Sequence, residues 1–168
     1  TEAKDLETLY TKAIQLSRKE DAERIVRLGL QKKDNHFFLV ERYRHLANEG
    51  LIQSSEATGI KAMLLSDNSP DLQKYHYELA IIEFEALSKD LNNDKYSADS
   101  AVAPLIAFID RYGADNPDNF WQIYMIIAQV YLDKNQIKDA LKYAQVSHAS
   151  APESVQPDIQ KFIVNIQK

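Results

Sequence analysis

Apolar residues recur along the chain at spacings of three and four, and short polar stretches separate the runs. Leu6, Leu9, Tyr10 and Ala13 lie at positions i, i+3, i+4 and i+7, the spacing that places side chains on one face of an α-helix. The polar stretch 18–21 interrupts this stripe before a second one begins. The alternating pattern of a half-buried strand occurs nowhere in the sequence, so the chain is predicted to be all-α.

Helix-ending and helix-starting residues divide the chain into nine expected helices. Gly50 ends the third helix, because glycine readily takes the left-handed conformation that follows a helix. The stretch SSEA (54–57) resembles a cap that begins the fourth, and Pro157 opens the ninth. The fifth helix, near 71–89, is expected to carry Tyr77, Ala80, Ile81 and Phe84 on one face. The sixth is expected to direct Ala101, Leu105, Phe108 and Ile109 inward and to end at Gly113.

A repeat of helix pairs is the next pattern that the sequence suggests. Counted in a 34-residue frame from Trp121, offsets 4, 7, 8, 11, 20, 24 and 32 are Tyr124, Ile127, Ala128, Tyr131, Ala140, Ala144 and Pro152. This arrangement resembles the tetratricopeptide repeat (TPR). In that family, small residues at offsets 8 and 20 let the two helices of a repeat approach closely, and the large residues fill the space between neighbouring repeats.

The resemblance implies a single domain over 1–168, built as a right-handed α-solenoid of about four antiparallel helix pairs. The expected repeats are 3–36, 36–69, 74–117 and 121–154, with a helix over 157–168 covering the last one. A long loop at 90–100 interrupts the third repeat. The match is best in the fourth repeat. In the second, Arg42 falls on a position that is usually apolar.

The same resemblance implies a binding surface along the first helix of each pair. The residues predicted to contact a partner there are Phe37, Val40, Arg44, Tyr75, Glu78, Ile82, Glu85, Met125, Gln129 and Leu132. The expected function is a non-catalytic scaffold or adaptor that holds a peptide or protein segment in a concave groove. The alternative is a structural or self-associating module of a longer chain or complex, so a homo-oligomer stays open.

Charge narrows the choice of partner. The chain carries a net charge of −5, and residues 62–120 hold 4 Lys and Arg against 11 Asp and Glu. Nucleic acids and anionic membranes favour basic surfaces, so neither is expected as a partner. A protein segment with hydrophobic and basic character fits an acidic middle region better. Solvated acidic helix faces are the alternative reading.

No catalytic arrangement is recognisable, so the chain is predicted not to be an enzyme, and no cofactor or metal is expected. The sequence has no cysteine, which excludes thiol catalysis, disulfides and thiolate metal sites within these residues. Its four histidines include no pair at i and i+4. Asp90, Asn92 and Asp94 imitate the start of a calcium loop, but Lys95 stands where such loops need glycine.

The compartment is not predicted. No apolar run approaches the roughly 20 residues of a membrane span, so the chain is expected to be soluble. The first ten residues contain neither an initiator Met nor a signal-peptide core. A processed form and a fragment of a longer protein are both open interpretations. Cytoplasmic and periplasmic or exported locations are therefore equally compatible with the sequence.

Overall fold

A computed structural model describes residues 2–89, 96–113 and 120–168 of the chain. In these ranges it contains nine α-helices and one 3-10 helix but no strand, so the all-α prediction is confirmed. The α-helices are α1 (Ala3–Gln15), α2 (Lys19–Leu30), α3 (His36–Asn48), α4 (Ser55–Ser66), α5 (Gln73–Ser88), α6 (Ala98–Tyr112), α7 (Trp121–Asp133), α8 (Ile137–Ser150) and α9 (Gln156–Ile166), with the 3-10 helix η1 (Pro70–Leu72) preceding α5. Most of the loop predicted at 90–100 lies outside the described residues.

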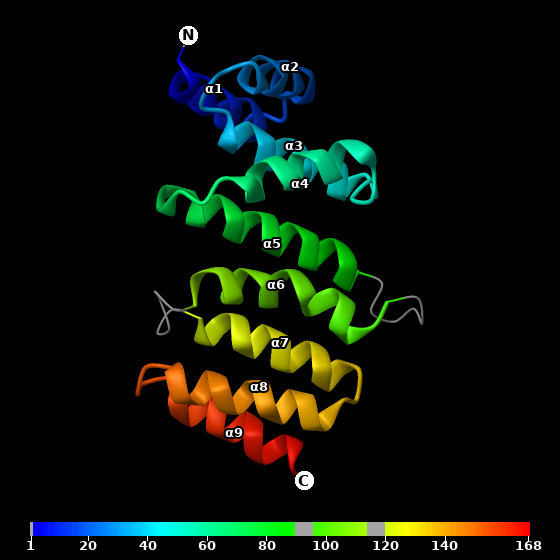
Figure 1. Cartoon of the computed structure of the whole chain (residues 1–168), viewed down its shortest axis with the longest axis vertical. Coiled ribbons are helices and arrows are strands. Elements are labelled where there is room, and N and C mark those ends of the chain that lie inside the picture. Colours follow the sequence, from blue (N-terminus) through cyan, green and yellow to red (C-terminus); the bar gives the residue numbers. More distant parts are fainter. Residues whose placement is uncertain (1, 90–95, 114–119) are drawn as a thin grey trace. The chain divides into compact units, whose positions relative to one another are not determined.

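The chain forms two compact units, which Figure 1 shows in successive colours. Unit 1 spans Thr1–Ala86 and contains α1 to α4 and nearly all of α5; unit 2 spans Leu87–Lys168 and contains α6 to α9. Consecutive helices pack against each other within each unit, as α1 does against α2 and α7 against α8. The single domain over 1–168, its four repeat boundaries and the right-handed solenoid stay predictions.

The tight turns between paired helices share one backbone motif. After α1, Ser17 has a positive φ of 55°, and the Arg18 N–H donates to the Ala13 carbonyl at 2.9 Å. After α7, Asn135 has a φ of 57°, and the Gln136 N–H donates to the Tyr131 carbonyl at 2.8 Å. Such a left-handed residue satisfies the last carbonyls of a helix while the chain reverses direction.

Two sequence signals fix the junction of α3 and α4 as predicted. Gly50 has a φ of 75°, and the next N–H, of Leu51, donates to the Leu46 carbonyl at 2.8 Å. Ser54 then caps α4, because its Oγ accepts a hydrogen bond from the Ala57 N–H at 3.2 Å. A cap of this kind contributes about 1 kcal/mol to helix stability.

The core of unit 1 lies mainly between α3, α4 and α5. Its members include Leu39, Tyr43, Leu46, Ile60, Leu64 and Leu79, none of them more than 7% exposed. A second cluster joins the α1/α2 hairpin to α3 through Leu6, Val26 and Phe38. Phe38 is fully buried against Gly29 of α2, whose missing side chain leaves room for the ring. The inner side of the hairpin is thus closely packed.

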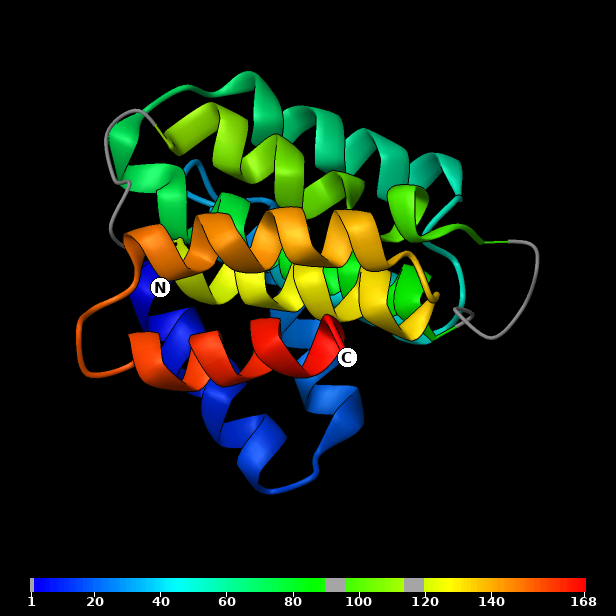
Figure 2. The same ribbon diagram turned by 90° about the horizontal axis from the view of Figure 1, so that it is seen from below.

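Unit 2 is built on the close pair α7 and α8, with α9 beside them. Ala128, Ala140 and Ala144 are all completely buried, and their small side chains allow the two helices to approach. Ile159 and Ile163 of α9 are 3% and 6% exposed and pack into the same cluster as Ala128 and Ala144. Figure 2 shows α7, α8 and α9 running side by side.

The buried face of α5 differs from the predicted one. The sequence placed Tyr77, Ala80, Ile81 and Phe84 on one face, whereas the buried residues are His76, Leu79, Ala80 and Ile82, and Tyr77 is 40% exposed. Because α5 is apolar nearly all round between 79 and 87, periodicity alone cannot select the inward side. The buried His76 Nε2 lies 2.6 Å from the Leu64 carbonyl, which gives this polar ring a hydrogen-bond partner.

None of the helices in the described ranges combines the length and hydrophobicity that a membrane-spanning segment requires.

Candidate functional site

The residues predicted to bind a partner fall into two groups. Phe37, Val40, Arg44, Tyr75, Glu78, Ile82 and Glu85 belong to unit 1, and Met125, Gln129 and Leu132 belong to unit 2. These two groups of residues are therefore described separately, each within its own unit. Their partner-binding role stays a prediction.

Two members of the first group are core residues. Val40 is 1% exposed and Ile82 is 4% exposed, and both belong to the cluster between α3, α4 and α5. Burial of each such side chain stabilises the fold by roughly 1.5–3 kcal/mol, and it leaves no surface for a partner. The sequence placed both side chains in an open groove. In the structure, α3, α4 and α5 pack around them, and this packing buries both.

Charged residues of the first group pair with each other. Arg44 lies 3.5 Å from a Glu78 oxygen and 3.6 Å from Glu41 Oε1. The Tyr10 hydroxyl donates to Glu41 Oε2 at 2.9 Å. Burial, reinforced by the Glu41 charge, raises the pKa of Tyr10, so the hydroxyl keeps the proton it donates. This network ties α1 to α3 and α3 to α5.

The remaining predicted residues make local contacts. Tyr75 stacks on His36 with ring centroids 5.9 Å apart, and Phe37 meets the ring of Tyr10 edge-on at 5.7 Å. Glu85 of unit 1 is exposed. In unit 2, the Gln129 amide donates to Asp133 at 2.7 Å. Met125 packs against the core of that unit, and Leu132 is half-buried.

A cleft of about 710 Å³ lined by both charged and apolar side chains opens between the α1/α2 hairpin and α3. Arg42 crosses its wall and holds Glu56 with two hydrogen bonds of 2.7 and 3.0 Å, which lower the pKa of that carboxyl. His45 lies 3.1 Å from Glu49 on the same wall. The charges of Arg42, Glu56, His45 and Glu49 are thus paired with one another along this wall.

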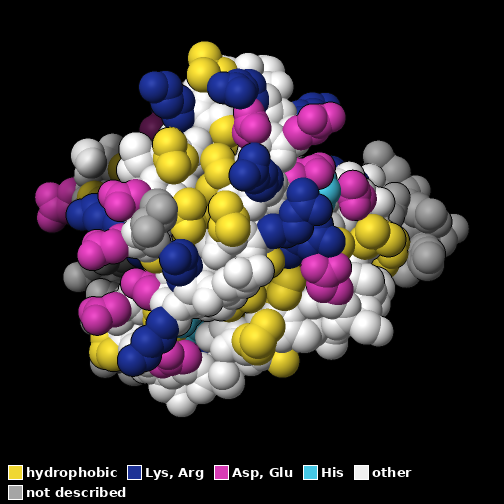
Figure 3. Space-filling view, turned by 90° about the horizontal axis from the view of Figure 1, so that it is seen from above, with side chains coloured by type: hydrophobic (Ala, Val, Ile, Leu, Met, Phe, Trp, Pro, Cys, Tyr) yellow, Lys and Arg dark blue, Asp and Glu magenta, His cyan; other side chains and the backbone are white. Residues whose placement is uncertain are grey.

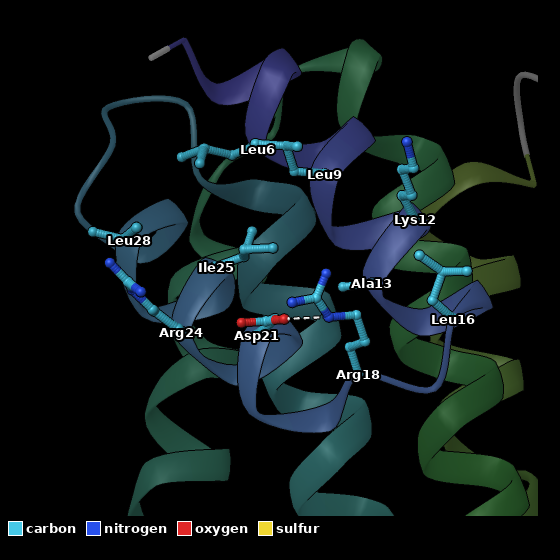
Figure 4. A pocket seen from close by; sticks show the side chains of 10 residues that line it. All are labelled: Leu6, Leu9, Lys12, Ala13, Leu16, Arg18, Asp21, Arg24, Ile25 and Leu28. Carbon is cyan, nitrogen blue, oxygen red and sulfur yellow. Dashed lines mark ion pairs between the residues drawn. The ribbon is translucent and has the colours of Figure 1, made fainter.

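A second cleft, of about 540 Å³, lies on the outer side of the α1/α2 hairpin (Figure 4). Its lining comes entirely from the two helices and the turn between them: Leu6, Leu9, Lys12, Ala13, Leu16, Arg18, Asp21, Arg24, Ile25 and Leu28. Leu9, Leu16 and Leu28 are 49%, 58% and 45% exposed, which is unusual for large aliphatic side chains in one place. We call this the outer cleft.

Positive charge surrounds the outer cleft. Arg18 pairs with Asp21 at 2.6 Å and closes one end. Lys12 of α1 and Arg24 of α2 stand on opposite sides of it, and neither has a recorded ion pair in the described residues. Figure 3, which looks onto this hairpin, shows hydrophobic side chains in the middle of the face with charged side chains around them.

Sequence reasoning missed the outer cleft because it assigned Leu9 to the inward stripe of the first helix. A signal was present in the width of the apolar surface. Leu6, Leu9, Ala13 and Leu16 form one row along α1, and Tyr10 and Ile14 form another. Two rows exceed what a single neighbouring helix can cover, so one had to remain open or meet a further partner.

The described residues contain neither a thiol nor a cluster of side chains that could bind a metal ion. The sequence holds no cysteine, and no group of three or more His, Asp or Glu side chains lies close enough to bind a metal ion in the part of the chain that the structure describes. The sulfur nucleophile of a thiol reaction is not among these 168 residues.

Comparison with known proteins gives one informative similarity. The chain is 34% identical over 164 residues to a protein of Chlamydia pneumoniae named "Thioredoxin-related protein DsbJ". The match covers 97% of this chain and 47% of that protein, so the chain spans about half the length of the curated relative that it matches. The sequence matches no protein-family profile, and no solved structure is detectably similar.

This similarity corrects the family that was predicted. The relative is named as thioredoxin-related, which contradicts membership of the TPR family, and no profile of that family matches. The physical reason lies in α7 and α8. Ala128, Ala140 and Ala144 are completely buried where two antiparallel helices meet, and any closely packed pair needs small residues there. The match to the 34-residue frame therefore reflects the close packing of two helices and not common descent with TPR proteins.

The function predicted from that family is corrected with it. The name of the relative points to thioredoxin-related chemistry, so the prediction of a non-catalytic scaffold or adaptor is contradicted, together with its alternative of a structural module. The prediction that the protein is not an enzyme is contradicted by the same finding. It rested on the lack of a catalytic motif in 168 residues, and these correspond to about half of the relative.

Proposed function

We propose that this chain serves a disulfide-related reaction, as the helical part of a disulfide oxidoreductase-like enzyme whose thiols lie outside these 168 residues. The observation that carries the proposal is the similarity of nearly the whole chain to a thioredoxin-related protein. Because every step of thiol–disulfide exchange needs a thiolate and this chain has no cysteine, we assign the thiols of the reaction to residues outside this chain.

The exchange itself is simple to assign. A thiolate attacks one sulfur of a disulfide, a new S–S bond forms, the old one breaks, and the departing thiolate takes up a proton. None of the three sulfur atoms in this exchange can come from this chain, because it has no cysteine. Its helices would instead hold the thiol-bearing region or the polypeptide substrate in place. Correct placement of reactants is itself a large part of rate enhancement.

Two further features fit this role as proposals. Disulfide-forming proteins act mainly in oxidising compartments, which favours a periplasmic or exported location over a cytoplasmic one. The successive antiparallel helix pairs within each unit support the proposed solenoid packing, which presents helix faces to partners.

An exchange assay with three samples tests the proposal. The first is the 168-residue chain alone, the second is the full natural polypeptide that contains it, and the third is that polypeptide mixed with a two-cysteine protein of the thioredoxin fold. Reduction of a disulfide-linked peptide by glutathione is followed in each. The chain alone should leave the rate unchanged.

Acceleration of about tenfold or more in the second sample places the thiols on the same polypeptide, and acceleration confined to the third places them on a separate protein. Each rate is compared with a control sample in which residues 1–168 are deleted. If neither sample exceeds its deletion control, the disulfide-related function of these residues is wrong.

A further inference from the structure

The outer cleft has a covered counterpart elsewhere in the chain. In unit 2, the α7/α8 hairpin has the same turn motif as α1/α2, with Asn135 in the place of Ser17. In this register Leu9, Lys12 and Ala13 correspond to Ile127, Val130 and Tyr131, which are at most 5% exposed. The helix α6 packs against α7 there, and its Asp99 accepts a hydrogen bond from the Tyr131 hydroxyl at 2.6 Å. α6 is a 15-residue helix whose buried residues are all apolar and whose first turn carries Asp99. The chain therefore shows which kind of element covers a hairpin of this type: a short amphipathic helix.

Charge adds a second requirement for whatever covers α1 and α2. Lys12 and Arg24 flank the apolar floor from opposite sides without recorded ion pairs in the described ranges, while Arg18 is already paired with Asp21. An occupant with Asp or Glu beside its apolar stripe would bring carboxylates close to both free cations. A basic occupant would meet like charges.

The shape of the cleft favours a helix over other occupants. Buried Leu6 and Ala13 form its floor, and exposed Leu9, Leu16 and Leu28 border it, so the surface is concave and fits a convex helix better than a flat bilayer. A second copy docking by the same face would place Lys12 and Arg24 against the same cations of the other copy.

We propose that the outer cleft is the docking site for an amphipathic helix of another polypeptide, with an apolar stripe edged by Asp or Glu. The site goes beyond the disulfide-related function, because it would select the same class of helix whatever reaction the chain serves. The helix lies between α1 and α2, its aliphatic side chains contact Leu9, Leu16 and Leu28, and its carboxylates meet Lys12 and Arg24.

Two designed helical peptides of about 14 residues test the site, since this length gives nearly four turns. Both carry the same Leu stripe at i, i+3, i+4, i+7 and i+11; one is edged with Glu and the other with Lys. Binding to the 168-residue chain is measured by titration calorimetry. The Glu-edged peptide should bind about tenfold more tightly than the Lys-edged one, and its affinity should fall as salt is raised.

Substitutions in the cleft locate the binding. Leu28→Gln should weaken the Glu-edged peptide about fivefold or more, whereas Leu51→Gln should leave its affinity unchanged. Leu28 and Leu51 are both 45% exposed, so the second is a matched control. Lys12→Glu combined with Arg24→Glu should reverse the preference toward the Lys-edged peptide. Helical content and melting temperature are checked for each variant to show that it remains folded.

Four outcomes would overturn the proposal. They are equal affinity for the two peptides, no binding of either, and an effect of Leu51→Gln equal to that of Leu28→Gln. The fourth is binding by the unmodified chain to itself or to anionic phospholipid vesicles that Leu28→Gln abolishes. That last result would assign the cleft to a second copy or to a membrane surface, and sedimentation of the chain alone and with vesicles separates the two. None of these results bears on the disulfide-exchange assay.

Discussion

The hairpins α1/α2 and α7/α8 turn in the same way but differ in what covers them. Ser17 and Asn135 occupy equivalent left-handed positions in the two turns. On α7/α8, the helix α6 packs over the corresponding side, where Ile127, Val130 and Tyr131 are buried. On α1/α2, no helix of unit 1 covers Leu9, Leu16 and Leu28. Apolar residues on the outside of a hairpin therefore act as core in one case and as available surface in the other.

The largest expected effect comes from removing an aliphatic side chain of α9 that packs in the core of unit 2, in comparison with one that borders the outer cleft. Ile163→Ala should lower the free energy of unfolding by about 2–4 kcal/mol, because it leaves a cavity between α9 and α8. Leu28→Ala should change it by less than about 0.5 kcal/mol, since that side chain is already 45% exposed. Urea titrations measure both. Similar losses in the two variants would mean that the outer cleft is closed in solution.

The inner and outer sides of α2 should also respond differently. A Cβ on Gly29 would overlap the ring of the fully buried Phe38, so Gly29→Ala should destabilise the protein by roughly 1–3 kcal/mol. Gly59 of α4 has nothing within 4 Å of an added Cβ. Gly59→Ala should therefore stabilise by about 0.5–1 kcal/mol through helix propensity alone. A stabilising Gly29→Ala, measured by the same titration, would show that α2 does not press on α3.

Close approach of α7 and α8 predicts a cost for any larger residue between them. Ala140 is completely buried, so Ala140→Leu should overpack the contact and cost about 1–3 kcal/mol. Ala103→Leu in α6 is the control, because that residue is exposed and should tolerate leucine within about 0.5 kcal/mol. An unchanged melting temperature for Ala140→Leu would contradict the register assigned to this pair.

The smallest expected effect concerns the shared turn motif. Serine is strained at a positive φ, whereas asparagine tolerates it better and glycine best. Ser17→Gly should raise the free energy of unfolding by about 0.5–1 kcal/mol, and Asn135→Gly should raise it by less. Thermal melts of the two variants give the comparison. A loss of stability in Ser17→Gly would mean that residue 17 does not hold the left-handed conformation.

Local sequence signals predicted the helices well because their causes are local. Gly50 ends α3 at a positive φ, Ser54 caps α4, and Pro157 lies in the first turn of α9, as the sequence indicated. Each depends on the backbone of its own few residues. The all-α class follows from the same signals, summed along the chain.

The inward faces and the site depend on elements that are distant in sequence, and there prediction failed. Ile82 was placed on an open groove and is in the core, whereas Leu9 was placed inward and is half exposed. Helices with apolar residues on more than one side can pack in several ways, and the neighbours decide. The proposed function was further hidden, because thiol–disulfide exchange needs a thiolate and these 168 residues contain no cysteine.

Amide hydrogen exchange of the free 168-residue chain tests the central difference between the two hairpins most directly. Protection reports the free energy of local opening, which should be smaller where one face of a hairpin is uncovered. Amides in α2 should exchange at least about tenfold faster than those in α8, and adding the Glu-edged peptide should slow exchange in α1 and α2 alone. Equal protection of α2 and α8 in the free chain would contradict an uncovered α1/α2 hairpin.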